Sequence, residues 1–238
     1  MKVLLLNGSR RNSGCTFTAL SEVAAALNEA GIETEIIQIG SEVMKGDIRD
    51  LVSEVHEKIK SADGLVVGSP VYFSSPSGEI LMFLDRLFVA AEKDLRLKPG
   101  CAVASARRGG TTATLDVLNK YFTYAEMPVV SSRYWNIVHG NTPDEVKQDQ
   151  EGLQIMRVLG RNMAWLMKCI EAGRTAGIAL PEQAKKEFTN FIRSYRRICG
   201  ARSRYFSGLP AIIPCPVSLL SARSKNIFFA RLKIIRSI

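Results

Sequence analysis

Residues 7–16, NGSRRNSGCT, bring hydroxyl, guanidinium and glycine groups together where an apolar segment gives way to a helix-forming one. The backbone N–H groups at the start of a helix point outward and carry partial positive charge, which favours a bound anion. Further donors are the hydroxyls of Ser9, Ser13 and Thr16 and the guanidinium of Arg10 or Arg11. The spacing therefore predicts a phosphate-binding loop, and the alternative is a Gly/Ser turn with solvated arginines.

The kind of phosphate is narrowed by two patterns that the loop lacks. Gly8 and Gly14 are one residue too far apart for the triphosphate-binding pattern G-x-x-x-x-G-K-[ST], and Cys15 stands where its lysine would be. The dinucleotide pattern G-x-G-x-x-G is also absent, and Gln38, at the end of the second strand, offers no acid for a ribose. A mononucleotide with a single phosphate fits the loop better.

A second loop, GSPVYFSSPSG at 68–78, carries aromatic side chains. Val71, Tyr72 and Phe73 follow a stiff Ser-Pro turn at the edge of the predicted sheet, where a flat ring is the natural packing partner. Tyr72 and Phe73 could instead cover the sheet or contact a second subunit.

A third loop, SARRGGT at 105–111, follows the fourth predicted strand. Gly109 and Gly110 let a backbone approach a ligand closely. Arg107 and Arg108 suit either a ring carbonyl or a phosphate of a pyridine nucleotide.

Strands and helices alternate along the chain and must position these loops. Predicted strands lie at 2–7, 34–39, 64–70, 101–106 and 128–135. Predicted helices lie at 16–30, 47–61, 77–92, 111–124, 143–172 and 181–197. Short, continuous apolar strands in this alternation predict a doubly wound α/β fold, a five-stranded parallel sheet with helices on both faces. Ligands of such sheets bind outside the carboxyl ends of the strands, where the loops described above begin.

The loops together resemble the NAD(P)H-dependent FMN reductase group of the flavodoxin-like superfamily, and its iron–sulfur flavoprotein branch in particular. The segments that carry the resemblance span roughly residues 1–175: GSRRNSGCT, GSPVYFSSPSGEILMFLDRLF, SARRGGTTATLD and PVVSSRYWNIVHG with the helix after it. The resemblance implies the strand order 2-1-3-4-5 and non-covalent FMN. The cofactor-binding residues that it implies are Ser9, Arg11, Ser13, Gly14, Cys15, Thr16, Pro70, Val71, Tyr72, Phe73, Ser105, Arg107, Gly109, Gly110 and Thr111.

The resemblance also implies the reaction. NADH or NADPH would pass a hydride from nicotinamide C4 to flavin N5, and the flavin would then reduce a small acceptor such as a quinone, a nitro or azo compound, or free flavin. The cofactor does this chemistry without a side-chain base, so no catalytic residue is predicted, and Trp135, Asn136 and His139 are interpreted as a pocket wall. The alternatives are a flavodoxin-type electron carrier without its own substrate and a regulatory protein that has kept the fold.

One stretch departs from the iron–sulfur branch. That branch has a compact cysteine cluster after its second strand, whereas residues 39–50, IGSEVMKGDIRD, contain no cysteine. Because an iron–sulfur cluster is held by about four thiolates, we expect no cluster and no other metal.

Composition sets the remaining expectations. The 238 residues are 46% hydrophobic, include five widely spaced cysteines and show no signal peptide or membrane-spanning run, which favours a cytoplasmic protein with reduced thiols. Of the net charge of +9, residues 199–238 supply +7 with no acid, which leaves +2 for the rest. We expect an FMN domain at 1–175, a helix at 176–198 and a poorly ordered basic tail at 199–238. The alternatives for the tail are a basic amphipathic helix that contacts anionic lipid or nucleic acid, and an extension that packs on a partner subunit. We also expect a homodimer or higher homo-oligomer that binds no nucleic acid.

Overall fold

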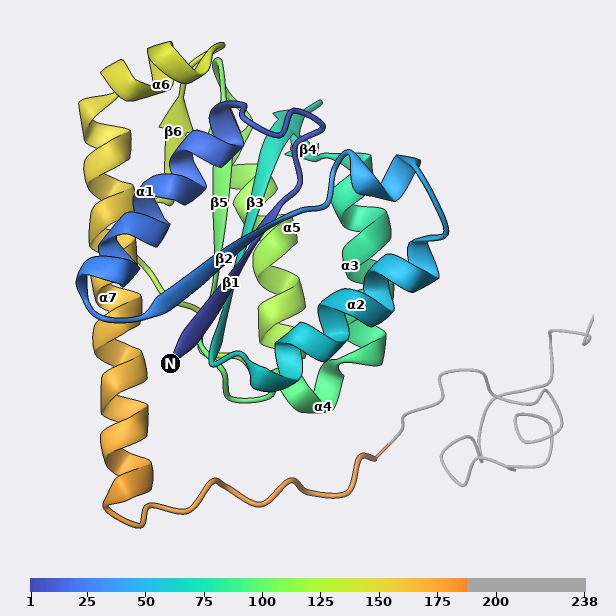
Figure 1. Cartoon of the computed structure of the whole chain (residues 1–238), viewed down its shortest axis with the longest axis vertical. Helices are drawn as coiled ribbons and strands as arrows, with labels where there is room; N and C mark the ends of the chain where they lie inside the picture. The colour runs from blue at the N-terminus through green and yellow to red at the C-terminus, as the bar shows by residue number, and fades with distance from the viewer. Residues whose placement is uncertain (188–238) are drawn as a thin grey trace, which may run out of the picture. The chain divides into compact units, whose positions relative to one another are not determined.

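Residues 1–187 are described by a computed structural model of the chain, and within them five parallel strands form the sheet in the order β2-β1-β3-β5-β6 (Figure 1). The strands are β1 (Lys2–Asn7), β2 (Glu33–Gln38), β3 (Gly64–Tyr72), β5 (Gly100–Ala106) and β6 (Ile137–His139). A further short strand, β4 (Ser75–Pro76), pairs antiparallel with β3. The predicted doubly wound α/β fold is confirmed.

Helices cover both faces of this sheet. They are α1 (Cys15–Glu29), α2 (Ile48–Ser61), α3 (Gly78–Ala90), α4 (Glu92–Leu95), α5 (Thr111–Tyr124), α6 (Pro143–Gln148) and α7 (Gln150–Thr175), with a 3₁₀ turn, η1 (Glu42–Met44). In Figure 1, α1 and α7 lie together on one face, and α2, α3 and α5 lie on the other.

The central strands supply both hydrophobic cores. Val3 and Leu5 of β1 belong to the core under α1 and α7, whereas Leu4 and Leu6 belong to the core under α2, α3 and α5. Successive side chains of a strand point to opposite faces, so a strand covered on both sides must be apolar at every position. This requirement explains the continuous apolar run at the start of the chain.

The fifth strand lies later in the chain than the predicted range 128–135. Val129 makes only an isolated parallel bridge to Gly100, and the regular strand at this edge is β6. Between the two, the chain turns toward α7, where the Ser132 hydroxyl donates to the carbonyl oxygen of Ile155 at 2.7 Å. The β-branched residues near 130 predicted the strand, but contacts with a distant helix displace it.

The end of β3 also differs from the sequence-based expectation. The strand runs to Tyr72 and folds back through Phe73 and Ser74 into β4, with Val71 paired to Pro76. Phe73 and Ser74 have φ values of 51° and 57°, so this is a two-residue hairpin with left-handed backbone at both turn positions, as in a type I′ turn.

The C-terminal helices differ from prediction as well. The helix predicted over 143–172 is divided into α6 and α7 at Asp149, whose side chain accepts a hydrogen bond from the N–H of Gly152 and starts a new helix. A helix was predicted over 176–198, but residues 178–187 have no regular secondary structure. The rest of that range and the basic tail lie outside the described residues. Among the described helices, none combines the length and the hydropathy that a bilayer crossing requires.

Candidate functional site

The carboxyl ends of β1, β3 and β5 lie side by side and start three loops along the upper edge of the sheet in Figure 1. Pairing of Asn7 with Gly68 and of Pro70 with Ser105 brings these ends into register. The loops border an open cleft with a volume of about 210 Å³. Its lining residues are Ser9, Arg11, Cys15, Thr16, Pro70, Val71, Tyr72, Ser105, Ala106, Arg107, Gly140 and Asn141.

The β1–α1 loop is fixed by side chains from the strand ends. Asn7 donates to Gln38 Oε1 at 2.7 Å and accepts from the N–H of Ser9 at 3.1 Å, and Gln38 in turn donates to the carbonyl oxygen of Ser9. The N–H of Gly8 donates to the carbonyl oxygen of Gly68 at 2.8 Å, and a Cβ at Gly8 would lie 2.8 Å from that oxygen. Glycine is therefore required for this close approach.

Two helices that start at this edge have open N-termini. Neither α1 nor α5 has a side-chain N-cap or an acidic residue in its first turn. By contrast, α2, α3, α6 and α7 each have both, with Asp47, Ser77, Thr142 and Asp149 as the caps. An uncapped N-terminus leaves N–H donors and partial positive charge available to an anion. The short helix α4 also lacks a side-chain cap but has acidic residues in its first turn, so among the described α-helices only α1 and α5, which follow the β1 and β5 ends, lack both.

The arginines of the loops are not equivalent. Arg10 pairs with Glu79, with 3.4 Å between Arg10 Nε and Glu79 Oε1, whereas Arg11 lines the cleft. Arg107 lines the cleft from the β5 side. Neither Arg11 nor Arg107 pairs with a carboxylate among residues 1–187. Two uncompensated guanidinium groups therefore face the same cleft, in accord with an anionic ligand.

The β3 side supplies a flat, partly apolar wall. Pro70, Val71 and Tyr72 line the cleft, and Tyr72 is about half exposed. Ser77, the N-cap of α3, anchors this segment, because its hydroxyl donates to the carbonyl oxygen of Gly8 at 2.9 Å. The wall and the β1–α1 loop are thus held by the same buried side chain.

Two further contacts connect the loops from below. The hydroxyls of Thr16 and Ser105 lie 2.8 Å apart and are buried. The Cys15 thiol donates to the carbonyl oxygen of Gly140 at 3.6 Å, and burial raises the pKa of this thiol. A neutral thiol is a weak nucleophile, so Cys15 acts here as part of the wall.

The predicted site residues fall into two groups. Those that the structure brings together around the cleft are Ser9, Arg11, Cys15, Thr16, Pro70, Val71, Tyr72, Ser105 and Arg107. Those that do not line it are Ser13, Gly14, Phe73, Gly109, Gly110 and Thr111. Gly14 and Gly110 are the N-cap residues of α1 and α5, and Thr111 is buried in the first turn of α5. Ser13, Phe73 and Gly109 are exposed.

Sequence reasoning missed Ala106, Gly140 and Asn141 as lining residues. Gly140 and Asn141 follow β6, so the misplaced fifth strand concealed them. The available signal was Gly140 itself, whose φ of 157° and contact with Val146 leave no room for a side chain. His139, by contrast, lines a neighbouring cavity of about 340 Å³ with Tyr134 and Asp149.

The donor set fits FMN. The open N-terminus of α1, together with Arg11 and the hydroxyls of Ser9 and Thr16, suits a phosphate monoester. The Pro70–Tyr72 wall suits a planar ring system. The cleft lining itself contains no Asp, Glu or His, and the Glu145 carboxylate next to it accepts a hydrogen bond from the N–H of Asn141.

Comparison with known proteins agrees with this geometry. A model of the family described as NADPH-dependent FMN reductase matches residues 1–142. An iron–sulfur flavoprotein of Methanocaldococcus jannaschii is 32% identical over 192 residues, which cover 72% of this chain and 100% of the relative. An iron–sulfur flavoprotein of Methanosarcina thermophila is 23% identical, over 73% of this chain and 99% of the relative.

Solved structures show the same fold at lower sequence identity. An archaeal flavodoxin superposes with a TM-score of 0.53 at 16% identity, over 71% of this chain and 99% of its own. RosB with a bound 8-demethyl-8-formylriboflavin-5′-phosphate intermediate superposes with a TM-score of 0.59 at 17% identity, over 94% of this chain and 98% of its own. These likenesses support the flavodoxin-like fold.

Proposed function

This chain belongs to the NADPH-dependent FMN reductase family, and from that premise we propose that it is an FMN-dependent NAD(P)H oxidoreductase that reduces a small acceptor. The acceptor classes are quinones, nitro or azo compounds, and free flavin. The observation that supports this proposal best is the cleft at the carboxyl ends of β1, β3 and β5. It combines an open helix N-terminus, two arginines that pair with no carboxylate among residues 1–187, and a wall made by Pro70, Val71 and Tyr72.

When bound, FMN would supply the two-electron redox chemistry between the pyridine nucleotide and the acceptor. The part of the chain itself is to bind the FMN and to orient it. The α1 N-terminus and Arg11 would hold the phosphate, and Pro70–Tyr72 would support the ring. Arg107 would add positive charge that favours electron density on the ring. The absence of Asp, Glu and His from the lining is in accord with hydride transfer and not with acid–base chemistry.

A flavodoxin-type electron carrier remains the second candidate, because an archaeal flavodoxin shares the fold. Such carriers tend to be acidic around the flavin, whereas this cleft is lined by two arginines and no acid. This difference favours the reductase.

The test is steady-state oxidation of NADPH and NADH by the purified, FMN-loaded protein with a benzoquinone as acceptor. We expect catalytic turnover that is saturable in both substrates and is lost on removal of FMN. A yellow protein that shows no turnover with either nucleotide would favour the electron carrier. A protein that binds no FMN would favour a regulatory role.

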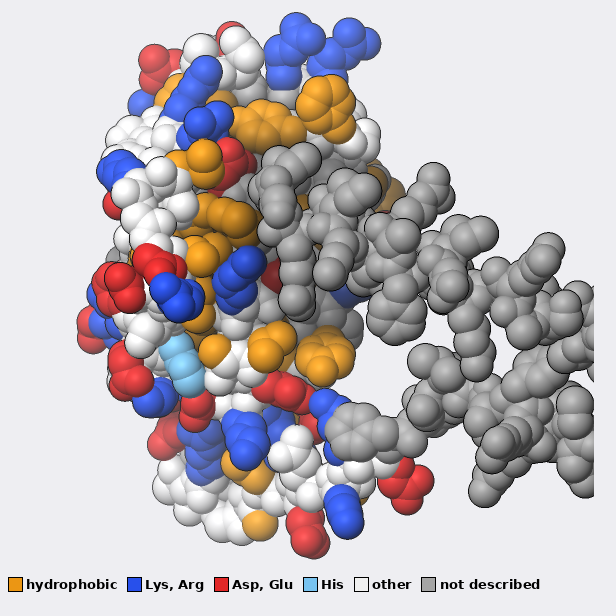
Figure 2. All heavy atoms as spheres, turned by 90° about the vertical axis from the view of Figure 1, so that its right-hand side faces the viewer, with side chains coloured by type: hydrophobic (Ala, Val, Ile, Leu, Met, Phe, Trp, Pro, Cys, Tyr) orange, Lys and Arg blue, Asp and Glu red, His pale blue; other side chains and the backbone are white. Residues whose placement is uncertain are grey.

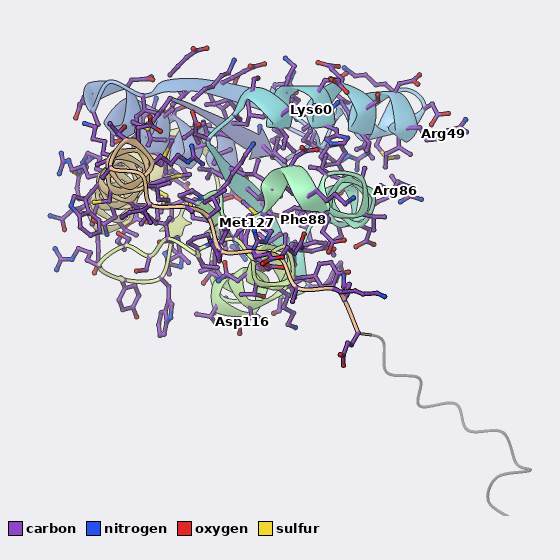
Figure 3. The ribbon with its side chains drawn as sticks, turned by 90° about the horizontal axis from the view of Figure 1, so that it is seen from below. Arg49, Lys60, Arg86, Phe88, Asp116 and Met127 are labelled. Atoms are coloured by element: carbon purple, nitrogen blue, oxygen red, sulfur yellow. The ribbon has the colours of Figure 1, made fainter. Side chains whose placement is uncertain are left out.

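We further propose that the protein forms a homodimer or a higher homo-oligomer. A groove of about 430 Å³ between α3 and α5 is mostly apolar, and Val89 of α3 is 77% exposed beside it. Figure 3 shows Phe88 on the inner side of α3 and Arg86 pointing away, and the Phe88 ring lies 5.3 Å from that of Tyr121. On the face that carries α2 and α3, hydrophobic side chains are visible among the charged ones (Figure 2).

A further inference from the structure

Phe73, at the tip of the β3–β4 hairpin, has an unusual conformation for an aromatic residue. Its φ is 51°, the next residue has a φ of 57°, and its side chain is fully exposed. Gly, Asn and Asp adopt this backbone at low cost, whereas a bulky side chain does so with strain. Phe73 therefore combines a strained backbone with an apolar ring in water, and neither feature helps the chain to fold. Such a combination points to a role in binding.

The surrounding structure holds the tip in place. Val71 pairs with Pro76 and Tyr72 pairs with Ser75 across the hairpin. On the far side, a Cβ at Gly110 would lie only 2.8 Å from the Cα of Ser74, so the tip rests directly on the start of α5. The backbone at Phe73 is consequently held at a fixed place, next to the lining residue Tyr72.

Its position relative to the cleft limits what the ring can contact. Tyr72 lines the cleft and Phe73, the next residue, does not. A ligand that fills the cleft and also touches Phe73 would therefore extend past the edge of the cleft. A pyridine dinucleotide has this form, because its second flat ring, adenine, lies at the far end from the nicotinamide.

The charges near this rim match the rest of such a ligand. Arg107 lines the cleft, and Arg108, the next residue, is exposed. Neither forms an ion pair with a carboxylate in the part of the chain that the structure describes. Guanidinium groups beside an exposed aromatic ring are suited to the phosphates and the base of a nucleotide.

We propose that Phe73 is a specificity-determining residue that stacks on the adenine of the pyridine dinucleotide, while the nicotinamide lies in the cleft. The inference rests on the proposed NAD(P)H oxidoreductase function and adds a second contact, outside the flavin site. The hairpin tip then contributes to the affinity for the pyridine dinucleotide, whereas hydride transfer takes place in the cleft.

The test compares two hydride donors, NADPH and reduced nicotinamide mononucleotide, which lacks the adenosine half. The variant Phe73→Asn keeps a residue that tolerates the left-handed backbone and removes the ring. We expect its KM for NADPH to rise about tenfold, as on loss of a base–aromatic stack, with kcat unchanged. Its KM for reduced nicotinamide mononucleotide should stay at the wild-type value, and Phe73→Tyr should restore the KM for NADPH.

Binding provides a second readout. The dissociation constant of NADP⁺, measured by calorimetry on the FMN-loaded protein, should rise about tenfold in Phe73→Asn. Trp165→Ala is the matched control, because Trp165 is an exposed aromatic on α7. We expect this control to leave both nucleotide parameters unchanged.

The outcomes are distinguishable. An equal rise in KM for both donors, a loss of FMN affinity or a change in sedimentation would overturn the inference, in favour of a general cleft defect, a flavin contact or a subunit contact respectively. Unchanged parameters in Phe73→Asn with normal wild-type turnover would overturn the inference alone. A wild-type protein that neither oxidises NADPH nor binds NADP⁺ would overturn the proposed function together with it.

Discussion

The hydroxyl oxygens of Thr16 and Ser105 lie 2.8 Å apart in a buried position, so that α1 and the end of β5 share one hydrogen bond beneath the cleft. Removing either partner leaves the other buried and unpaired, which costs about 1–3 kcal/mol. We expect Ser105→Ala and Thr16→Val each to lower the free energy of unfolding by about this amount. Because the residues are coupled, the double variant should lose less than the sum. Urea unfolding of the FMN-free protein measures all three, and strict additivity would contradict the contact.

Arg11 and Arg10 form a matched pair of variants. Arg11 lines the cleft without an ion pair among the described residues, whereas Arg10 pairs with Glu79. A charge-assisted hydrogen bond contributes about 1.5–3 kcal/mol, so Arg11→Ala should weaken FMN binding by roughly 10- to 150-fold. Arg10→Ala should change it little. Quenching of flavin fluorescence measures the FMN dissociation constant of each variant. A larger effect at Arg10 would assign the phosphate contact to Arg10 instead of Arg11.

Stability should depend on alkaline pH through Cys101, which is buried in β5. Burial raises the pKa of this thiol from 9.0 to about 12. The pKa of the Cys101 thiol is higher in the folded than in the unfolded chain, so the stability that the buried neutral thiol contributes is fully present below about pH 9. It is lost as the pH rises toward 12, by about 1.4 kcal/mol per unit. The destabilisation caused by Cys101→Ala should therefore shrink by about 2 kcal/mol between about pH 7.5 and 10.5. A pH-independent difference between the two unfolding curves would contradict this.

The visible absorption spectrum should show flavin bands alone. Of the cysteines that the structure describes, Cys101 is buried in β5, Cys15 lines the cleft and Cys169 is exposed on α7. No three His, Cys, Asp or Glu side chains among residues 1–187 are grouped to hold a metal ion, and an iron–sulfur cluster is held by about four thiolates. Broad absorption beyond the flavin bands, with iron in the purified protein, would refute the prediction.

The oligomer should depend on Val89. This side chain is exposed on α3 beside the apolar groove, so Val89→Lys costs little in the folded monomer but places a charge in the proposed interface. We expect sedimentation to show a dimer or larger species for the wild-type protein and smaller species for Val89→Lys. Trp165→Lys, on α7, is the control, and this variant should form the same oligomer as the wild-type protein. A wild-type monomer at micromolar concentration would contradict the proposal.

The sequence was sufficient to predict the sheet and most of the cleft. Continuous apolar runs mark strands that are buried on both faces, and the loops after them fall at one edge in any parallel sheet. Nine predicted residues, including Ser9, Tyr72 and Arg107, accordingly line the cleft.

The errors have different causes, one of them a contact between distant parts of the chain. The segment near Ser132 has β-branched neighbours but forms a hydrogen bond to α7, which no local pattern indicates. The hairpin at Phe73 lacks the Asn or Gly that normally marks such a turn, so its geometry could not be predicted. The break before α7 did have a local signal, because Asp149 is a common N-cap residue.

Because α1 begins without a side-chain cap, bound FMN would be a structural component as well as a reagent. A ligand that binds only the folded chain adds about 2.7 kcal/mol at a concentration 100 times its dissociation constant. Here the phosphate would also supply the cap that the chain itself does not provide for α1. Fraying of the first turn of α1 and loss of the cofactor would then be coupled, so added FMN should slow proteolysis of the protein.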